Sequence, residues 1–598
     1  MKTQKYAVNQ HLIETILSWV RAGEIAIPEI QRPFVWSPKK VRNLMDSLYQ
    51  GYPVGYLIAW RNPNVKLKDG STSEGKKILI DGQQRVTAFM AAMLGRPVIN
   101  KDYRQVKIRI AFNPLTEAFE VLNSAIHNDR SWIPDIAPLV SGEQRSIPAV
   151  RAYLEHNPNA DEVRVENSIC NLTDMTKKQL GLIELDSDLD IETVTKIFVR
   201  INAEGVVLSQ ADFAMSKIAS NEKYGGPRLR KCIDYFCHLA VAPEFYNQIV
   251  DVDHEFTSTP FFQKMAWLRN ENDDLYDPEY TDLLRVAFTS EFNRGRLADL
   301  VSLLSGRNFE AKTYEEAIAE ESFKKLETGI LNCMNETGFK RFLMIIKSAG
   351  FISPGLIRSK NALNFAYIVY LKLRSEDYPA DEIEKYVRRW FVLTLLTGRY
   401  SGSPETRFDY DIRQISGGKM KEFLANMEQG ELSDAYWNTT LPRKFTTSVA
   451  SSPYFNVYLA AQVTLRNRGF LSKHITVADL IAHRGDIHHI FPKDYLKKHG
   501  KTKSEYNQIA NYAYMQSEIN IGIGNVSPRA YFSNLHDQCA GGEAKHGGIT
   551  DLNDLRTNLG ENGIPEDISC MEVGNYRDFL ERRRVLMAQK IKDYYHSL

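Results

Sequence analysis

The stretch KILIDGQQRV, residues 77–86, decides how the N-terminal part of the chain folds. Residues 77–80 form a short, mostly apolar run of the kind found in buried strands, and residues 86–94 carry apolar side chains at helical spacing. Residues 81–85, with Gly82 among them, therefore lie between the end of a strand and the start of a helix. We expect the surrounding segment to be a mixed α/β module.

This turn has the residues of an anion-binding site. A helix N-terminus offers free backbone N–H groups and a partial positive charge, and Gly82 lets a phosphate approach the backbone closely. Arg85 can add a bidentate phosphate contact, and Asp81 can hold a cation or orient a water. A strand, a glycine turn and a helix also follow one another in many α/β proteins without any ligand, so a structural turn is the alternative. The chain has no Walker A lysine motif, so any nucleotide chemistry here differs from that of P-loop enzymes.

The chain divides into three parts. In the first we expect a helix over 6–26, an extended segment over 27–36, a helix over 38–50 capped by Ser37, a strand over 54–60, a loop over 61–76 and a hairpin from 105–112 and 117–121. From about residue 190 the pattern becomes helical, over 190–200, 209–220, 226–240, 281–304, 313–327, 338–348, 361–374 and 380–398. A linker around 440–452 precedes the last part. The sequence thus predicts a multidomain α+β protein with domains at 1–235, 236–445 and 446–598.

The chain ends in a predicted helix, 575–595, with a basic composition. Its cationic side chains either contact phosphates or form a solvated face: Arg582, Arg583, Arg584, Lys590 and Lys592.

The composition limits the classes of protein to which the chain can belong. The chain has 598 residues, 43% hydrophobic and 25% charged, which is near the average for soluble globular proteins. No stretch reaches the roughly 18 apolar residues of a membrane span, and the N-terminus lacks a signal peptide, so we expect a cytoplasmic protein without membrane contact. The six cysteines form no CxxC pair, which argues against a zinc ribbon. A net charge of +1 neither supports nor excludes DNA as a partner.

The strongest motif is DIHHIFPK, residues 486–493. Two adjacent histidines beside an aspartate form a compact polar group that would be costly to bury in a plain core. Asn511 and Asn520 follow, so the order is His, Asn, Asn over about 35 residues. Phosphodiester hydrolysis needs a base to activate water and a cation to stabilise the leaving oxygen, and these residue types can supply the base and the ligands. The alternative is a surface or helix-capping histidine pair.

Residues 486–529 resemble an HNH endonuclease of the ββα-metal class, and more narrowly the C-terminal domain of GmrSD-type restriction endonucleases, whose Gly-Asn-x-Ser-Pro segment reads GNVSP at 524–528. The resemblance implies that His489 is the general base and that His488 is a metal ligand, with Asp486 as an alternative or additional carboxylate. Asn520 takes the third metal position, although Asn525 fits another register. Asn511, the central asparagine, ties the loop together and orients the base. An oxygen ligand in place of a third histidine favours Mg²⁺ or Mn²⁺.

The N-terminal motif DGQQR resembles the GmrSD-type N-terminal domain, which is similar to the ParB/sulfiredoxin nucleotide-binding fold. The flanking segments IPEIQRPFVW (27–36) and FVRIN (198–202) agree with it. The resemblance implies a nucleoside triphosphate site, with possible NTPase activity, at Asp81, Gly82, Gln83, Gln84 and Arg85, with Gln31 and Arg32 as neighbours and Arg200 and Asn202 completing it. Arg200 and Asn202 alternatively cap the next helix. The middle region resembles the helical connector of the same family.

We therefore expect a metal-dependent DNA endonuclease regulated by nucleotide, which restricts modified or phage DNA as an antiviral defence. The alternatives are a nucleotide-hydrolysing regulator with an inactive HNH part, and a DNA-binding scaffold. Which DNA is cut, which nucleotide is used, whether it activates or inhibits, and whether the product is a nick or a double-strand break stay open. A double-strand break would need a homodimer or two visits, because one HNH site cuts one strand at a time.

Overall fold

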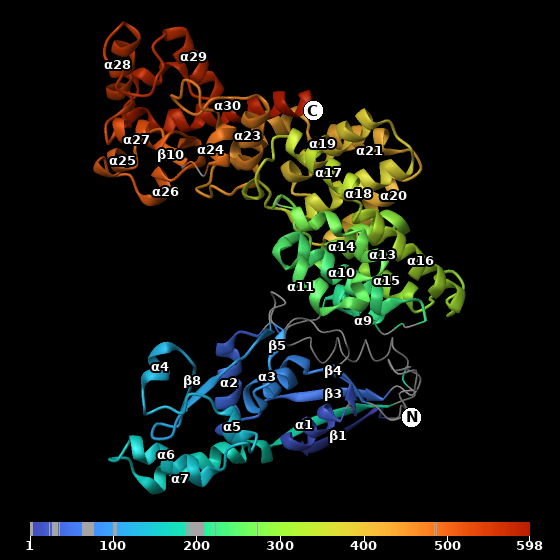
Figure 1. Cartoon of the computed structure of the whole chain (residues 1–598). Coiled ribbons are helices and arrows are strands. Elements are labelled where there is room, and N and C mark those ends of the chain that lie inside the picture. The colour runs from blue at the N-terminus through green and yellow to red at the C-terminus, as the bar shows by residue number, and fades with distance from the viewer. Residues whose placement is uncertain are drawn as a thin grey trace. The chain divides into compact units, whose positions relative to one another are not determined.

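The computed structural model describes residues 4–22, 24–26, 34, 36–61, 77–99, 105–186, 189, 209–219, 221, 223–271, 273–483, 485 and 487–598. The chain forms two compact units, Met1–Arg230 and Lys231–Leu598 (Figure 1). The division falls within helix α10 (Gly226–Val241). The expected further boundary at 445 stays a prediction.

A sheet of five strands, counted over the described residues, forms the centre of unit 1. Its strand order is β1 (Tyr6–Leu12), β9 (Gln179–Leu185), β3 (Tyr56–Arg61), β4 (Lys77–Asp81) and β2 (Ile25–Ala26). β9 pairs antiparallel with β1, from Tyr6 opposite Leu185 to Leu12 opposite Gln179, and parallel with β3. β4 pairs antiparallel with β3 and parallel with β2. The sheet is thus mixed, and β4 carries the N-terminal motif at its end.

Helices α1 (Ile13–Arg21), α2 (Pro38–Tyr49) and α3 (Gln83–Leu94) share one apolar core with strands of the sheet. α2 begins as its sequence predicts, because the Ser37 side chain accepts a hydrogen bond from the Lys40 N–H and proline occupies the first turn. The remaining elements of unit 1 are β5 (Val98–Ile99), β6 (Gln105–Val106), β7 (Ile110–Asn113), β8 (Ala118–Val121), α4 (Ser124–Asn128), α5 (Ala137–Val140), α6 (Ser146–His156), α7 (Glu162–Thr173) and α9 (Gln210–Ala219).

Two predictions for this unit are wrong in part. Residues 6–12 form strand β1 rather than the first half of a helix, because they pair along their whole length with the distant strand β9. The expected hairpin is shorter than predicted, since β7 pairs with β8 whereas β6 pairs with β5. The helix expected over 190–200 lies outside the described residues.

Unit 2 is mostly helical. Its first part holds α11 (Tyr246–Val252), α12 (His254–Thr257), α13 (Pro260–Gln263), α14 (Tyr280–Phe292), α15 (Leu297–Leu304), α16 (Glu316–Cys333), α17 (Glu336–Ser348), α18 (Lys360–Ser375), α19 (Ala380–Thr397), α20 (Pro404–Ile415), α21 (Met420–Glu431) and α22 (Leu441–Lys444). The helix expected over 281–304 is two helices, because Asn293 takes a left-handed conformation with φ 52° and ends α14.

The rest of unit 2 contains a small antiparallel pair of strands among helices, called the hairpin below although two short helices lie between its strands. Its elements are α23 (Pro453–Thr464), α24 (Val477–Ala482), β10 (Ile487–His489), α25 (Lys493–Lys498), α26 (Lys503–Tyr506), β11 (Tyr512–Tyr514), α27 (Ser517–Ile523), α28 (Pro528–Cys539), α29 (Leu552–Glu561) and α30 (Tyr576–Ser597). α25 and α26 lie between β10 and β11, whereas only Met515 and Gln516 separate β11 from α27.

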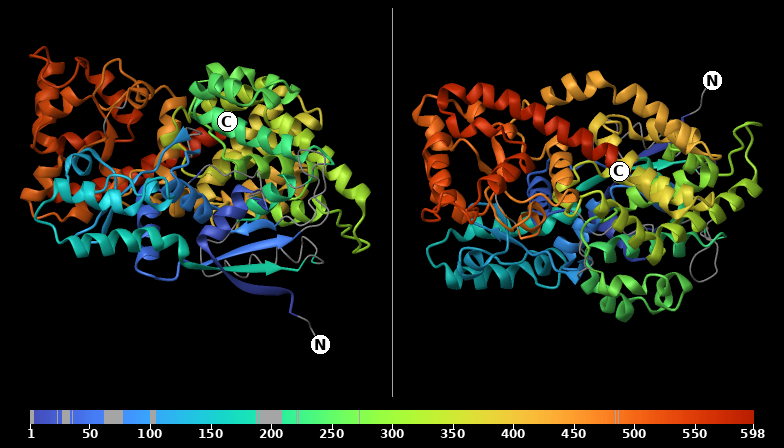
Figure 2. Two further views of the ribbon diagram at one scale, coloured as in Figure 1. Left: turned by 60° about the horizontal axis from the view of Figure 1, so that its bottom comes forward. Right: turned by 90° about the horizontal axis from the view of Figure 1, so that it is seen from above.

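The long helix α30 connects the two parts of unit 2. Figure 2 shows it in red, running from the other red and orange elements to the yellow helices. At its start Arg583 donates a hydrogen bond to the Ala510 carbonyl, and at its end Tyr595 donates one to Glu428 of α21. Buried contacts at both ends therefore hold the hairpin region against the helical region.

Candidate functional site

The two motif histidines lie on strand β10, which pairs antiparallel with β11. His488 is opposite Ala513 and His489 is opposite Tyr512. Both histidines are half-buried.

His489 is held from several directions. Its Nε2 is 3.0 Å from Oδ1 of Asn507, and its ring packs edge-on against that of Tyr512, with 5.1 Å between the centroids. An amide oxygen accepts, so Nε2 carries the proton and Nδ1 of the neutral ring is left as a proton acceptor. Burial lowers the pKa of His489, the hydrogen bond that its ring donates to Asn507 opposes this shift, and the charge of Lys493 adds to it. The neutral ring is therefore favoured.

Asn511 is fully buried and joins the two strands of the hairpin. Its Oδ1 accepts a hydrogen bond of 2.8 Å from the Phe491 N–H, and its Nδ2 donates one of 3.1 Å to the Phe491 carbonyl. Its own carbonyl accepts from the Ile490 N–H. The side chain thus satisfies both backbone polar groups of Phe491, a buried residue two positions after the histidine pair. Sequence position alone does not reveal this contact.

Two further buried side chains support this segment, and neither was predicted for the site. Tyr531 donates a hydrogen bond to the Ile490 carbonyl, and Arg583 donates one of 2.8 Å to the Ala510 carbonyl. Arg583 is 1% exposed, so it is neither a phosphate contact nor part of a solvated face. Phe579 and Met587, four residues away on either side, are buried too, and this helical spacing was the available signal.

The structure describes only some of the residues that are predicted to hold a metal. Asn520 is half-buried on α27, and the alternative Asn525 is exposed in the loop that follows. Asp486 lies outside the described residues. Over the part of the chain that the structure describes, no group of three or more His, Cys, Asp or Glu side chains is placed to hold a metal ion. Among the described residues, the candidate donors here are therefore His488 and Asn520.

The N-terminal motif lies at the junction of β4 and α3, as its sequence predicts. Gly82 has φ 91°, and a Cβ at this position would be 2.3 Å from Cδ2 of Leu57, so both conformation and space require glycine. Arg85 donates a hydrogen bond of 2.8 Å to the Tyr56 carbonyl, and its guanidinium lies close to Gly55 and Gly82. Gln83 donates to the Leu79 carbonyl.

This turn combines a partly buried guanidinium with a nearby carboxylate. Burial lowers the pKa of Arg85 and the charge of Asp81 opposes that shift, but a guanidinium stays protonated in proteins. Gly82 is the N-cap of α3, a helix of 12 residues, and makes no side-chain cap. The first turn of α3 therefore presents backbone N–H groups next to a fixed cation. Gln31, Arg32, Arg200 and Asn202, which were predicted to complete this site, lie outside the described residues.

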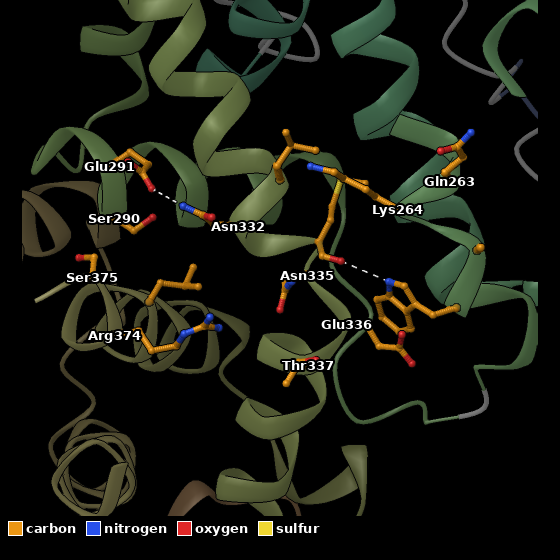
Figure 3. A pocket seen from close by; sticks show the side chains of 15 residues that line it. Gln263, Lys264, Ser290, Glu291, Asn332, Asn335, Glu336, Thr337, Arg374 and Ser375 are labelled. Carbon is orange, nitrogen blue, oxygen red and sulfur yellow. Dashed lines mark hydrogen bonds between the residues drawn. The ribbon is translucent and has the colours of Figure 1, made fainter. Parts of the chain in front are cut away.

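A cavity of about 620 Å³ lies elsewhere, in the helical region of unit 2 (Figure 3). Asn332 and Glu291 point toward one another across its wall and are hydrogen-bonded at 2.8 Å. Asn335 caps α17 by accepting from the Gly338 N–H. None of the residues predicted for either site lines this cavity. Because these lining groups already bond to one another or to the backbone, we assign no chemistry to it.

Comparison with known proteins identifies the class to which the N-terminal part is similar. Residues 13–219 match the family model described as the N-terminal domain of the GmrSD restriction endonucleases. Over 562 residues the chain is also 23% identical to an uncharacterized protein of Methanocaldococcus jannaschii, covering 86% of this chain and 84% of that protein. The family match supports a restriction endonuclease, for which DNA is a plausible substrate. In the described part of the chain, no helix is both long enough and apolar enough to cross a membrane.

Proposed function

We propose that this chain is a metal-dependent DNA endonuclease with an HNH-type catalytic centre on β10, β11 and α27. The observation that carries the proposal is the pair His488 and His489 on β10, whose partner strand β11 leads directly into the helix bearing Asn520. The match of residues 13–219 to a restriction endonuclease family supports the same reading independently, because it concerns a different part of the chain.

His489 is the general base of this proposal. Its Nε2–H is engaged by Asn507, so Nδ1 faces the reaction as the proton acceptor. A water beside Nδ1 gives its proton to the ring as its oxygen bonds to phosphorus. The bond from phosphorus to the leaving sugar oxygen then breaks, and a solvent proton neutralises that oxygen. A correctly placed base contributes about 10²–10⁴-fold to such a reaction.

His488, Asn520 and Asp486 are the proposed ligands of Mg²⁺ or Mn²⁺, and Asn525 is the alternative to Asn520. The donor types fit a weakly held cation, since one imidazole and one amide oxygen leave several positions to water. When bound, the cation would neutralise the phosphate and stabilise the leaving oxygen. Asn511 is a positioning residue in this scheme, because its hydrogen bonds reach the Phe491 peptide rather than the reacting groups.

The first turn of α3 is the proposed nucleoside triphosphate site. Gly82 and the N–H groups of Gln83 and Gln84 would surround a phosphate, and Arg85 would neutralise part of its charge. Asp81 would orient a water or hold a cation. Gln31, Arg32, Arg200 and Asn202 are proposed to complete a ParB-like site. Nucleotide binding there would regulate cutting of phage or modified DNA.

The direct test is incubation of the protein with supercoiled plasmid, plain and phage-modified, with Mg²⁺ or Mn²⁺ and with or without nucleoside triphosphates. We expect metal-dependent nicking or linearisation, and a loss of at least about 100-fold in His489→Ala. His483→Ala is the matched control, because His483 is exposed and bonded only to its own helix.

Cutting by His489→Ala at more than about a tenth of the wild-type rate would contradict the assignment of the base. No cutting of any substrate, together with nucleotide hydrolysis that Asp81→Ala abolishes, would instead favour a nucleotide-hydrolysing regulator with an inactive HNH part.

A further inference from the structure

The segment after the histidine pair concentrates positive charge. Residues 493–503 contain Lys493, Lys497, Lys498, Lys501 and Lys503 but a single acidic residue, Asp494. The whole chain, in contrast, has 75 basic and 74 acidic residues. The segment forms α25 and α26, and the buried Leu496 anchors α25 to the core, so the lysines are held on the outer side of a fixed element.

Two of these lysines converge on one aromatic ring. Nζ of Lys493 is 5.9 Å from the ring centroid of Tyr506, and Nζ of Lys497 is 5.7 Å from the same centroid. Lys493 and Lys497 are four residues apart on α25 and therefore share one face of the helix. We refer to Lys493, Lys497 and Tyr506 as the lysine clamp.

The clamp lies beside the proposed catalytic base. The ring centroids of Tyr506 and His489 are 6.4 Å apart, and the charge of Lys493 acts on His489. Tyr506 is 7% exposed, and its carbonyl accepts hydrogen bonds from Asn511 and Tyr576, so the ring is a rigid support. The two ammonium groups are thus fixed in relation to the hairpin.

The charges of the clamp are available to a ligand. Lys497 pairs with Asp494 at 3.2 Å, but both side chains are about half exposed, and exposed pairs are worth only about 0–1 kcal/mol. For Lys493, the described residues supply no carboxylate within ion-pair distance. Two lysines that face the same point beside a base would repel one another, and a shared anion removes that repulsion.

We propose that Lys493 and Lys497 bind a backbone phosphate of double-stranded DNA adjacent to the one that is cut. The inference rests on the proposed nuclease function and names the surface by which that centre holds its substrate. Ammonium groups bind phosphate as point charges, and such contacts position a duplex without reading its sequence. A purely structural cation–π cluster would contribute about 0.5–1 kcal/mol to stability and nothing to DNA binding.

Salt dependence separates these readings. In the His489→Ala background, which prevents cutting, we would measure binding of a fluorescein-labelled plain DNA duplex between 50 and 200 mM NaCl. Each phosphate contact contributes about 0.9 to the slope of log K against log salt concentration. Because the two lysines share one phosphate, Lys493→Gln/Lys497→Gln should lower the magnitude of the slope by about 0.9. Lys493→Arg/Lys497→Arg keeps both charges and should keep the slope.

Lys419→Gln/Lys421→Gln is the matched control. These two lysines are exposed at the start of α21, on the far side of unit 2 from α25 in Figure 1. An unchanged slope and affinity in the clamp variant, or an equal loss in the control, would overturn the clamp. Plasmid cutting by the wild type is measured separately. If the protein cuts DNA but the clamp variant binds as the wild type does, only the clamp is wrong. If the clamp variant loses the salt dependence but the wild type does not cut, only the nuclease function is wrong.

Discussion

Replacing Asn511 with alanine tests whether this residue holds the hairpin or takes part in chemistry. The wild-type side chain satisfies both the N–H and the carbonyl of Phe491, and both residues are fully buried. Alanine leaves these two polar groups without partners and without access to water. Each such group costs about 1–3 kcal/mol, so Asn511→Ala should lower the free energy of unfolding by about 2–6 kcal/mol.

Asn511→Asp tests the role of the Asn511 side chain as a hydrogen-bond donor. A carboxylate keeps the acceptor for the Phe491 N–H but faces the carbonyls of Phe491 and Tyr506, to which the amide donates. Burial and these oxygens would raise the pKa of the new carboxyl in the folded state above its unfolded value. The folded state then binds the proton more tightly, so the stability deficit should shrink as pH falls from 7 toward 5.

The assay is urea denaturation followed by tryptophan fluorescence and circular dichroism, with Asn525→Ala as control because Asn525 is exposed. The control should match the wild type within about 0.5 kcal/mol. If Asn511→Ala matches it as well, yet abolishes cutting, the positioning role is wrong and Asn511 acts in the reaction itself.

Three other substitutions test the contributions of a buried carboxyl, a glycine with positive φ and a buried arginine to stability. Burial, reinforced by neighbouring acids, raises the pKa of Asp277 to about 6, so its contribution to stability falls as pH rises from about 4 to 6. In urea titrations, Asp277→Asn should therefore raise the free energy of unfolding by about 1 kcal/mol at pH 7, after discounting for solvent screening, and should leave it unchanged at pH 4. Gly82→Ala should cost about 2–4 kcal/mol through backbone strain and a clash, whereas Gly51→Ala, with positive φ but open space, should cost only about 1. A thermal scan in which the two glycine variants melt together would contradict the clash. Arg583→Met should lower the free energy of unfolding by about 1–3 kcal/mol, because it leaves buried carbonyls unpaired. The exposed Arg582→Met should lower it by less than about 1 kcal/mol. Equal losses would mean that the buried hydrogen bonds of Arg583 do not contribute to stability.

Local signals were enough for elements that are capped or bounded within the sequence. Helix α2 begins at Pro38 after its Ser37 cap, and β4 and α3 meet at Gly82, as predicted. They were not enough for β1, because residues 6–12 continue the apolar spacing of α1 and become a strand only by pairing with β9. α14 ends at Asn293, and the nearby Gly295 packs closely against the backbone of Asp409 on the distant helix α20, a contact that the local sequence does not show.

The site shows the same contrast. The motif histidines could be picked out from residue type and order, but the partners that define their geometry could not. Asn507 contacts His489 from 18 residues away, and Arg583 reaches the hairpin from 73 residues beyond Ala510. No spacing rule connects such positions, since the contacts arise only when these segments pack together in the folded chain.

The place of β9 in the sheet of unit 1 has a consequence for how the protein is made. β9 lies between β1 and β3, and its partner β1 is separated from it by more than 160 residues of chain. As the ribosome extends the polypeptide, the motif turn at 81–85 is synthesised about a hundred residues before the strand that closes its sheet. Until residue 185 emerges, β1 and β3 have open edges that can pair with another chain. The nascent N-terminal unit is therefore most exposed to aggregation in the interval before β9 is complete, and a fragment ending at residue 178 should be insoluble where one ending at 230 is soluble.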